Sequence, residues 1–279
     1  MRYDAYLDGA PLIITAALTG GVHGKEANPQ IPETPDEIGR AAAAVEEAGA
    51  AVVHLHARRP TGERSFDTAC FQAIDDAVRA QTDDIIIQHS TGGTGASAAA
   101  RHGPLHTDPP PEMASLDMGP LNRYDHLTSE NTRGTIDALH DDMRDRGIKP
   151  ELEVFNDGHM NEVHALLDRK SVAAPIYATL IFGGGTLTRP KPRNVLHAIS
   201  NLPDGVRFNT LAFGQHQLPL TTLGILLGGH VRVGLEDNIY YRSGELATNA
   251  QLVERTVAIA TALERDVASP EQARSLLGI

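Results

Sequence analysis

Short apolar runs alternate with longer amphipathic stretches along the whole chain, a pattern that is typical of strands alternating with helices. The predicted strands are residues 11–17, 50–54, 85–89, 113–116, 151–155, 176–181, 207–211 and 231–234. The predicted helices are residues 35–48, 67–80, 97–101, 129–146, 158–167, 191–200, 218–227 and 244–264, of which the third has the weakest pattern. Eight strands that are each followed by a helix predict an α/β fold, a single (β/α)8 TIM barrel that spans residues 1–279 as one domain. An open, doubly wound sheet is the alternative.

The first predicted helix has clear signals for its start and its end. Thr34 is placed to cap the helix, Pro35 stands at the first helical position, and two acidic residues follow in the first turn. Gly49 is the residue type that commonly ends a helix. These signals place the helix between the strands at 11–17 and 50–54, as a βαβ unit requires.

Composition and charge exclude several classes of partner. The chain has 279 residues, with 24 basic and 36 acidic side chains and a formal net charge of -12, which argues against nucleic acid. No apolar run approaches the length of about 20 residues that a membrane-spanning helix needs. The sequence starts without the basic and apolar regions of a signal peptide, and its single cysteine, Cys70, fits a reducing compartment. We therefore expect a cytoplasmic protein in which Cys70 is a small buried residue of a helix rather than a nucleophile.

The sequence His54-Leu55-His56 ends the second predicted strand. Because side chains alternate between the two faces of a strand, both imidazoles can reach one metal ion at its C-terminal end. The last predicted strand is followed by two carboxylates, Glu236 and Asp237. In a closed barrel the first, second and last strands are neighbours, and catalytic groups gather at the C-terminal strand ends. Two His and one Glu with an open fourth position form a known type of catalytic zinc site, whereas the alternative is a pair of core histidines.

Several segments, in order and with similar spacing, match a known family. They are ITAALTG (14–20), IP (31–32), TPDE (34–37), AGA (48–50), HLHAR (54–58), STGG (90–93), PEMA (111–114), GGHVR (228–232), EDN (236–238) and NAQLV (249–253). With this set, which covers nearly the whole chain, the sequence resembles the β-keto acid cleavage enzymes. No single motif is decisive, but the ordered set is highly specific.

The resemblance implies a zinc-dependent (β/α)8 barrel that condenses a β-keto acid with acetyl-CoA and releases acetoacetate and a new acyl-CoA. It also implies self-association into a homo-oligomer, with a tetramer suspected. The site residues that it implies are His54, His56 and Glu236 as zinc ligands, and Arg232, Asp237 and Ser90 as catalytic groups.

The implied reaction needs these residue types. A β-keto acid can chelate zinc, which then acts as a Lewis acid and stabilises the enolate formed at C2. Asp237 would take the C2 proton as general base, with Arg232 holding its geometry. The carbanion attacks the acetyl thioester, CoA thiolate attacks the former β-carbonyl, and a retro-Claisen cleavage releases acetoacetate. Ser90 would assist acyl transfer, although it could equally be a plain turn residue.

A glycine-rich segment with nearby cations follows the sixth predicted strand. Its residues are Gly183, Gly184 and Gly185, followed by Arg189, Lys191 and Arg193. Bare glycine backbone can approach CoA closely, and cations favour its phosphates. We predict that this segment binds acetyl-CoA, and the alternative is a flexible loop with solvated charges.

One position departs from the pattern of the family. A family member with an amino substrate carries a Glu two residues after the Thr-Gly pair of the first loop, where this chain has Val22. A cationic substrate tail would lose its counter-charge there, and burying an unpaired ammonium is costly. Loops after the first and fourth strands carry His23, Lys25 and Arg123, which would suit an acidic substrate tail. The alternative is that these side chains are solvated or paired with acidic neighbours. The substrate tail is therefore predicted to be neutral or anionic.

Other interpretations stay open. The same barrel could be a zinc aldolase or hydrolase that needs no CoA. It could also be a non-catalytic barrel that binds a metal or a metabolite, although Arg232 and Asp237 would then lack a purpose. His102 and His106 precede the proline-rich run 108–111, which predicts a stiff loop, and a second metal site there is the less favoured interpretation.

Overall fold

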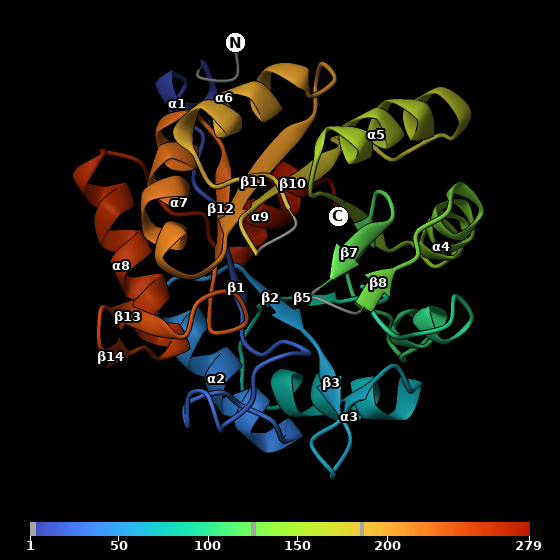
Figure 1. Cartoon of the computed structure of the whole chain (residues 1–279). Helices are drawn as coiled ribbons and strands as arrows, with labels where there is room; N and C mark the ends of the chain where they lie inside the picture. Colours follow the sequence, from blue (N-terminus) through green and yellow to red (C-terminus); the bar gives the residue numbers. More distant parts are fainter. Residues whose placement is uncertain (1–3, 124–126, 185–186) are drawn as a thin grey trace.

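The computed structural model describes residues 4–123, 127–184 and 187–279. Within them, parallel strands close into a barrel in the order β1-β12-β11-β10-β9-β6-β5-β2 (Figure 1). The barrel strands are β1 (Ile14–Ala17), β2 (Val52–Leu55), β5 (Ile86–His89), β6 (Met113–Asp117), β9 (Lys149–Val154), β10 (Tyr177–Phe182), β11 (Arg207–Ala212) and β12 (His230–Val233). This confirms the predicted (β/α)8 barrel and rules out the open sheet, because β12 pairs with β1 and closes the ring.

Helices surround the barrel, as Figure 1 shows. They are α1 (Asp4–Leu7), α2 (Pro35–Glu47), α3 (Thr68–Arg79), η1 (Ala100–Leu105), α4 (Arg133–Asp145), α5 (Asp157–Arg169), α6 (Pro192–Asn201), η2 (Gly214–His216), α7 (Gln217–Leu226), α8 (Asn249–Ala262) and α9 (Pro270–Leu277). The predicted start of α2 is confirmed, because Thr34 and Glu37 cap each other's backbone N–H groups. No helix in the described ranges combines the length and apolar character needed to cross a membrane.

Three hairpins were not predicted from the sequence. They are β3 (Ala57–Arg58) with β4 (Arg64–Ser65), β7 (Leu121–Arg123) with β8 (Leu127–Ser129), and β13 (Tyr240–Arg242) with β14 (Glu245–Leu246). Each hairpin follows a barrel strand within a few residues and so extends the C-terminal end of the barrel, which we call the upper end. The opposite end is called the lower end.

The hairpins and one proline correct three predicted helix boundaries. The helix predicted over 129–146 begins only at Arg133, because Ser129 belongs to β8. The helix predicted over 244–264 begins at Asn249, after β14. The helix predicted over 97–101 is instead the 3-10 helix η1, in which Pro104 lacks the N–H that an α-helix would use.

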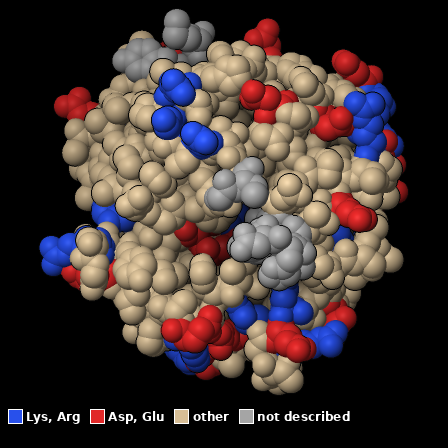
Figure 2. Space-filling view, viewed as in Figure 1, with Lys and Arg blue, Asp and Glu red and all other residues tan. Residues whose placement is uncertain are grey.

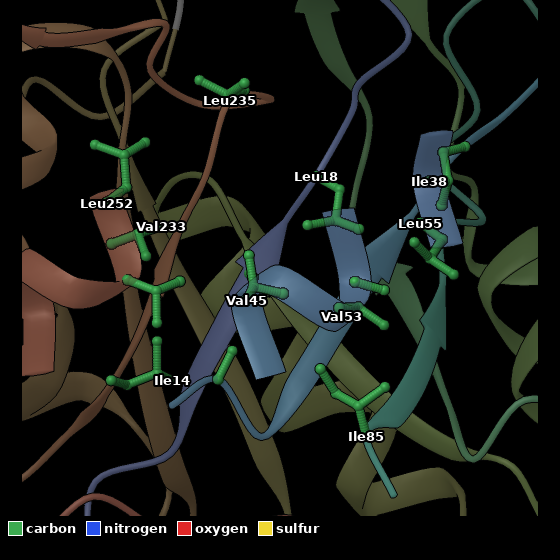
Figure 3. Packing of buried hydrophobic residues seen from close by; sticks show 14 of the residues in the cluster. Ile14, Leu18, Ile38, Val45, Val53, Leu55, Ile85, Val233, Leu235 and Leu252 are labelled. Atoms are coloured by element: carbon green, nitrogen blue, oxygen red, sulfur yellow. The ribbon is translucent and has the colours of Figure 1, made fainter. Parts of the chain in front are cut away.

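Apolar side chains fill the layer between the barrel and its helices. Figure 3 shows one such region, where Ile14, Val53 and Val233 of the strands pack with Val45 of α2 and Leu252 of α8. Cys70 of α3 is half-buried against the same cluster, which agrees with its predicted role as a small helix residue. A second cluster fills the layer under α4 to α7. Packing on both sides fixes the positions of the strand ends that carry the polar residues.

The lower end is closed by α9 and by polar contacts to the backbone. Leu277 of α9 packs with Ile13 and Tyr177 beneath the strands. His230 Nδ1 accepts a hydrogen bond of 3.0 Å from the backbone N–H of Ile13. The buried guanidinium of Arg265 donates to the backbone carbonyls of Ala10, Ile225 and Gly229. These contacts tie the first and last strands together.

Candidate active site

His54 of β2 and His56, which follows the strand directly, are buried at the upper end of the barrel, as their alternating positions predicted. His54 Nδ1 donates to Gln88 Oε1 of β5 at 2.8 Å. This hydrogen bond fixes the tautomer and leaves the lone pair of His54 Nε2 available. The Nε2 atoms of His54 and His56 both face Glu236.

A tight turn after β12 carries Glu236 to this position. Gly234 has φ of +139°, and a Cβ there would lie 2.2 Å from the carbonyl oxygen of Ala17, so only glycine fits. A Cβ on Gly20 would lie 2.7 Å from Glu236 Cγ. The close approach of β1 to β12 therefore requires glycine on both sides, and it leaves room for the carboxylate.

The donor atoms of the three side chains lie close enough together to hold one metal ion. His56 Nε2 lies 3.3 Å from Glu236 Oε1, and His54 Nε2 lies 3.8 Å from Glu236 Oε2. Ligands bound at about 2.1 Å in a tetrahedral zinc site are about 3.4 Å apart. Glu236 Oε2 is buried and has no hydrogen-bond partner among the described residues. A buried carboxylate oxygen that faces two imidazoles is the kind of group that a metal ion would satisfy.

Arg232 of β12 lies next to this cluster and contacts three carboxylates. Its Nε and Nη2 atoms donate to the two oxygens of Asp237, both at 2.9 Å. Its Nη2 lies 2.6 Å from Glu236 Oε1, and its Nη1 lies 3.6 Å from Glu153 Oε1 of β9. One buried cation thus orients both carboxylates that follow β12, as the predicted pairing of Arg232 with Asp237 requires.

Burial and charge give the two adjacent carboxyls different pKa values. Burial alone would raise the pKa of Glu236, but Arg232 and the two imidazoles hold it well below its usual range. Burial raises the pKa of Asp237 to about 7, against the opposing charge of Arg232. Burial also lowers the pKa of His54 and His56. Neutral imidazoles beside an ionised Glu236 are the protonation states that bind a metal ion.

Sequence reasoning missed four buried polar residues around this cluster, namely Gln88, Asp117, Glu151 and Glu153. Burial, with Asp117 beside it, raises the pKa of Glu153 well above its usual range. Glu151 accepts a hydrogen bond from Thr179 of β10. A signal was present in the sequence, because Glu151-Leu152-Glu153 has the same spacing of two as the histidines and lies in a predicted strand.

Ser90 lies at the same end, directly after β5. Its backbone N–H donates to the carbonyl of Leu55 at 3.0 Å, and its Oγ accepts from the N–H of Gly92 at 3.3 Å. A Cβ on Gly92 would lie 3.4 Å from Ser90 Oγ and 3.9 Å from Asp117 Oδ2. Ser90 therefore lies in a turn, as one prediction had it, and this turn holds it at the upper end, where the other candidate site residues lie.

Figure 2 shows a hollow on this face of the molecule, with acidic side chains visible inside it. The first loop of the barrel lies at this end, and Val22 in it is 55% exposed. Arg58 donates to the carbonyls of Gly20 and His23 in that loop, and the backbone of His23 is thereby fixed. Arg64, which pairs with Arg58 across the β3–β4 hairpin, donates to the carbonyl of Gly92 after β5. Both arginines thus lie on one hairpin beside the first loop.

Other predicted residues have different surroundings. Lys25 forms an ion pair with Glu37 of α2, so its positive charge is already balanced by a carboxylate of this chain. The backbone of Arg123 belongs to β7, but its side chain is outside the described part of the chain. Gly183 and Gly184 follow β10 with positive φ values of 91° and 74°. Gly185 lies outside the described residues, and the side chains of Arg189, Lys191 and Arg193 are exposed beyond it.

Comparisons with known proteins agree on one family. The model of the beta-keto acid cleavage enzyme family matches residues 11–279. The 3-keto-5-aminohexanoate cleavage enzyme of Fusobacterium nucleatum subsp. nucleatum is 37% identical over 270 residues, which is 96% of this chain and 98% of that protein. The 3-oxoadipate:acetyl-CoA acetyltransferase of Cupriavidus necator is 32% identical over 274 residues, or 96% of this chain and 95% of that protein.

A solved structure agrees with the fold. The apo structure of ObcA matches with a TM-score of 0.77 at 20% sequence identity. The match covers 90% of this chain and 66% of that longer chain. At this level of identity the likeness supports the barrel architecture only.

Proposed function

Since the chain belongs to the beta-keto acid cleavage enzyme family, and is thus an enzyme of the acyl-transferring, C–C bond-cleaving class, we propose that it uses zinc to react a β-keto acid with acetyl-CoA. The products would be acetoacetate and a new acyl-CoA. The observation that carries this proposal is the convergence of His54, His56 and Glu236 beside the Arg232–Asp237 pair. Such a donor set next to a buried carboxylate supports proton abstraction from an activated carbon.

The residues that would hold the metal and the base Asp237 lie side by side and would serve the same substrate. A zinc ion held by His54, His56 and Glu236 would supply Lewis-acid chemistry at the keto oxygen of the substrate. Asp237 follows Glu236 directly and is oriented by two hydrogen bonds from Arg232. It is therefore placed to take a proton from C2 of a substrate bound beside Glu236.

The acyl exchange then follows in two steps. The C2 carbanion attacks the carbonyl carbon of acetyl-CoA, and CoA leaves as the thiolate. The thiolate attacks the former β-carbonyl, the bond from that carbon to C2 breaks, and Asp237 returns its proton to C2 of acetoacetate. Ser90, which is buried after β5, would assist through its hydroxyl. Backbone at Gly183 and Gly184, with Arg189 and Lys191 beyond them, would bind CoA.

We propose a neutral or anionic substrate tail. Val22 offers no counter-charge to an ammonium. Arg58 and Arg64 pair across the β3–β4 hairpin and contact the first loop and the loop after β5, so positive charge lies beside the first loop. A cationic tail that reaches this hairpin would be repelled, whereas a carboxylate would be attracted.

The test is mass spectrometry of CoA products. Zinc-loaded protein is mixed with acetyl-CoA and a matched panel: 3-oxohexanoate, 3-oxoadipate and 3-keto-5-aminohexanoate, whose tails are neutral, anionic and cationic. We expect acetoacetate plus the matching acyl-CoA for the first two substrates and little product for the third. Val22→Glu should raise turnover of the cationic substrate at least tenfold relative to the anionic one, and Val22→Leu serves as the control for size.

Two outcomes contradict the proposal in different ways. Preferred turnover of 3-keto-5-aminohexanoate by the wild type would refute the tail assignment but not the reaction. The absence of any new thioester across the panel, with zinc confirmed as bound, would refute acyl transfer. Cleavage without acetyl-CoA would then point to an aldolase or hydrolase.

A further inference from the structure

Three side chains outside the barrel site meet between η1 and α4. His102 lies on η1, His106 directly follows it, and Asp142 lies on α4. His102 Nδ1 is 2.6 Å and His106 Nε2 is 2.9 Å from the same atom, Asp142 Oδ2. The donor atoms of the three residues lie within 4.8 Å of one another. Two imidazoles and one carboxylate thus converge from segments 36 to 40 positions apart in the sequence.

We propose that His102, His106 and Asp142 form a second metal site, which takes a divalent transition-metal ion such as Zn²⁺. This inference goes beyond the proposed acyl transfer and does not depend on it. Imidazole nitrogens with a single carboxylate favour Zn²⁺, Ni²⁺ or Cu²⁺, whereas Mg²⁺ and Ca²⁺ prefer oxygen ligands.

The spacing of the donor atoms suits such an ion after a small adjustment. Ligands of a tetrahedral zinc ion are about 3.4 Å apart, so each imidazole would move away from Asp142 by less than about 1 Å. The side chains of His102 and His106 are 29% and 41% exposed, which leaves them room to turn. The same exposure leaves an outward position at which water can complete the coordination.

The surroundings hold the three residues in place. Arg146 Nε donates to the other oxygen of Asp142 at 2.8 Å and orients the carboxylate. The backbone of η1 is fixed from the interior, because Thr68 Oγ1 donates to the carbonyl of Gly103 and the buried His89 Nδ1 donates to that of Pro104. Outer contacts of this kind orient metal ligands and strengthen binding.

An ion at this position would fasten η1 to α4. η1 also carries Arg101, whose buried side chain donates to the carbonyl of Thr91 at 2.7 Å and to that of Glu130 at 3.2 Å. Thr91 directly follows Ser90. The second metal would therefore stabilise the segment that holds Ser90 at the upper end, through Arg101, without contacting the substrate.

The test counts zinc in protein that has been stripped of metal and dialysed against zinc, by plasma mass spectrometry. For the wild type we expect two ions per chain. His106→Ala and Asp142→Asn should each hold one ion and lose at least tenfold in affinity at the second site, whereas His56→Ala should lose only the barrel ion. His164→Ala, which removes an exposed histidine bonded to the carbonyl of Asn201, is the matched control and should hold two.

A thermal measurement guards against variants that fold poorly. Zinc should raise the melting temperature of His56→Ala through the second site, and this rise should disappear when Asp142→Asn is added. Asp142→Asn keeps a hydrogen-bond acceptor for the imidazoles, so a cluster held only by hydrogen bonds would change little. Equal zinc content and affinity in His106→Ala and the wild type would overturn the proposal. Counting zinc needs no turnover, so failure of the acyl-transfer proposal would leave this result readable.

Discussion

At the lower end of the barrel, the buried polar side chains of Arg265 and His230 bind backbone groups, whereas at the upper end Arg232, Glu236 and Asp237 bind one another. Backbone partners are held in place by the chain on either side of them and cannot leave. Side-chain partners can exchange when a metal or a substrate enters. Glu236 also keeps one buried oxygen without a hydrogen bond among the described residues.

The difference shows how one barrel separates stability from chemistry. Satisfied contacts to backbone contribute to folding and offer nothing to a ligand. Charges that share partners in a buried place contribute less to stability, because their desolvation offsets their attraction. Changes at the two ends should therefore have different effects, and four measurements test this separation.

The largest effect is expected for Asp237→Asn at the upper end. The amide keeps the shape of the carboxylate but cannot take the proton from C2, so kcat should fall on the order of 10³-fold. Steady-state kinetics with equal zinc content in both proteins measure it. A loss of less than tenfold would remove Asp237 as the base, and a large drop in melting temperature would assign it to stability instead.

Arg265→Met tests the opposite end. The variant leaves carbonyls of Ala10, Ile225 and Gly229 without their charged donor, so the free energy of unfolding should fall by about 3 kcal/mol. Urea unfolding measures the loss. We expect kcat per folded molecule to stay within about twofold of the wild type. A large fall in kcat at unchanged stability would contradict the separation between a stabilising lower end and a catalytic upper end.

Removal of the barrel metal should affect the upper end and leave the contacts of the lower end unchanged. Zinc at a hundred times its dissociation constant stabilises a protein by about 2.7 kcal/mol, and a chelator removes this contribution together with activity. The stabilisation by zinc at the barrel site should vanish in His56→Ala and persist in Arg265→Met. Thermal unfolding at several zinc concentrations checks this, and a zinc effect that is equal in all proteins would contradict it.

The smallest effect concerns Lys149 at the start of β9. Its Nζ donates to the carbonyl of Ala173 at 2.9 Å, and burial lowers its pKa to about 8. In the unfolded chain the amine keeps its proton up to a pH of about 10.4. Burying the protonated amine therefore lowers the free energy of unfolding by its full amount below pH 8, and this loss disappears as the pH rises toward 10.4.

Lys149→Met removes this penalty. At pH 7 it should stabilise the protein by about 1 kcal/mol, well below the full pKa shift because the hydrogen bond to Ala173 is also lost. The gain should shrink at pH 9.5. Melting temperatures of both proteins at the two pH values test it, and a gain that does not change with pH would exclude Lys149 as the cause.

Most of the fold could be predicted from the sequence because barrel strands are short apolar runs between amphipathic helices. The helix boundaries that failed involve the upper end, where β8 and β14 precede their helices. Two-residue and three-residue strands bury too few side chains to leave a pattern of period two. The weak helical pattern near η1 also did not distinguish an α-helix from the 3-10 helix that contains Pro104.

The candidate site was predictable where polar residues stand at the ends of apolar strands, as for His54, His56 and Glu236. Gln88 and Glu153 were missed, because a polar residue inside a strand says nothing by itself about which neighbour it meets. That information depends on strand order and register, such as the pairing of His54 with Gln88 across β2 and β5. Residues of η1 and α4 likewise meet only in the folded chain.

The strand order has a consequence for how the protein is made. His54 and His56 are synthesised early, but Glu236 follows β12, and β1 must lie between β2 and β12 before the three can meet. A nascent chain therefore cannot form the complete site while it is still short. Any ion that needs all three ligands must be acquired after the barrel has closed, from the supply of metal that the finished protein meets.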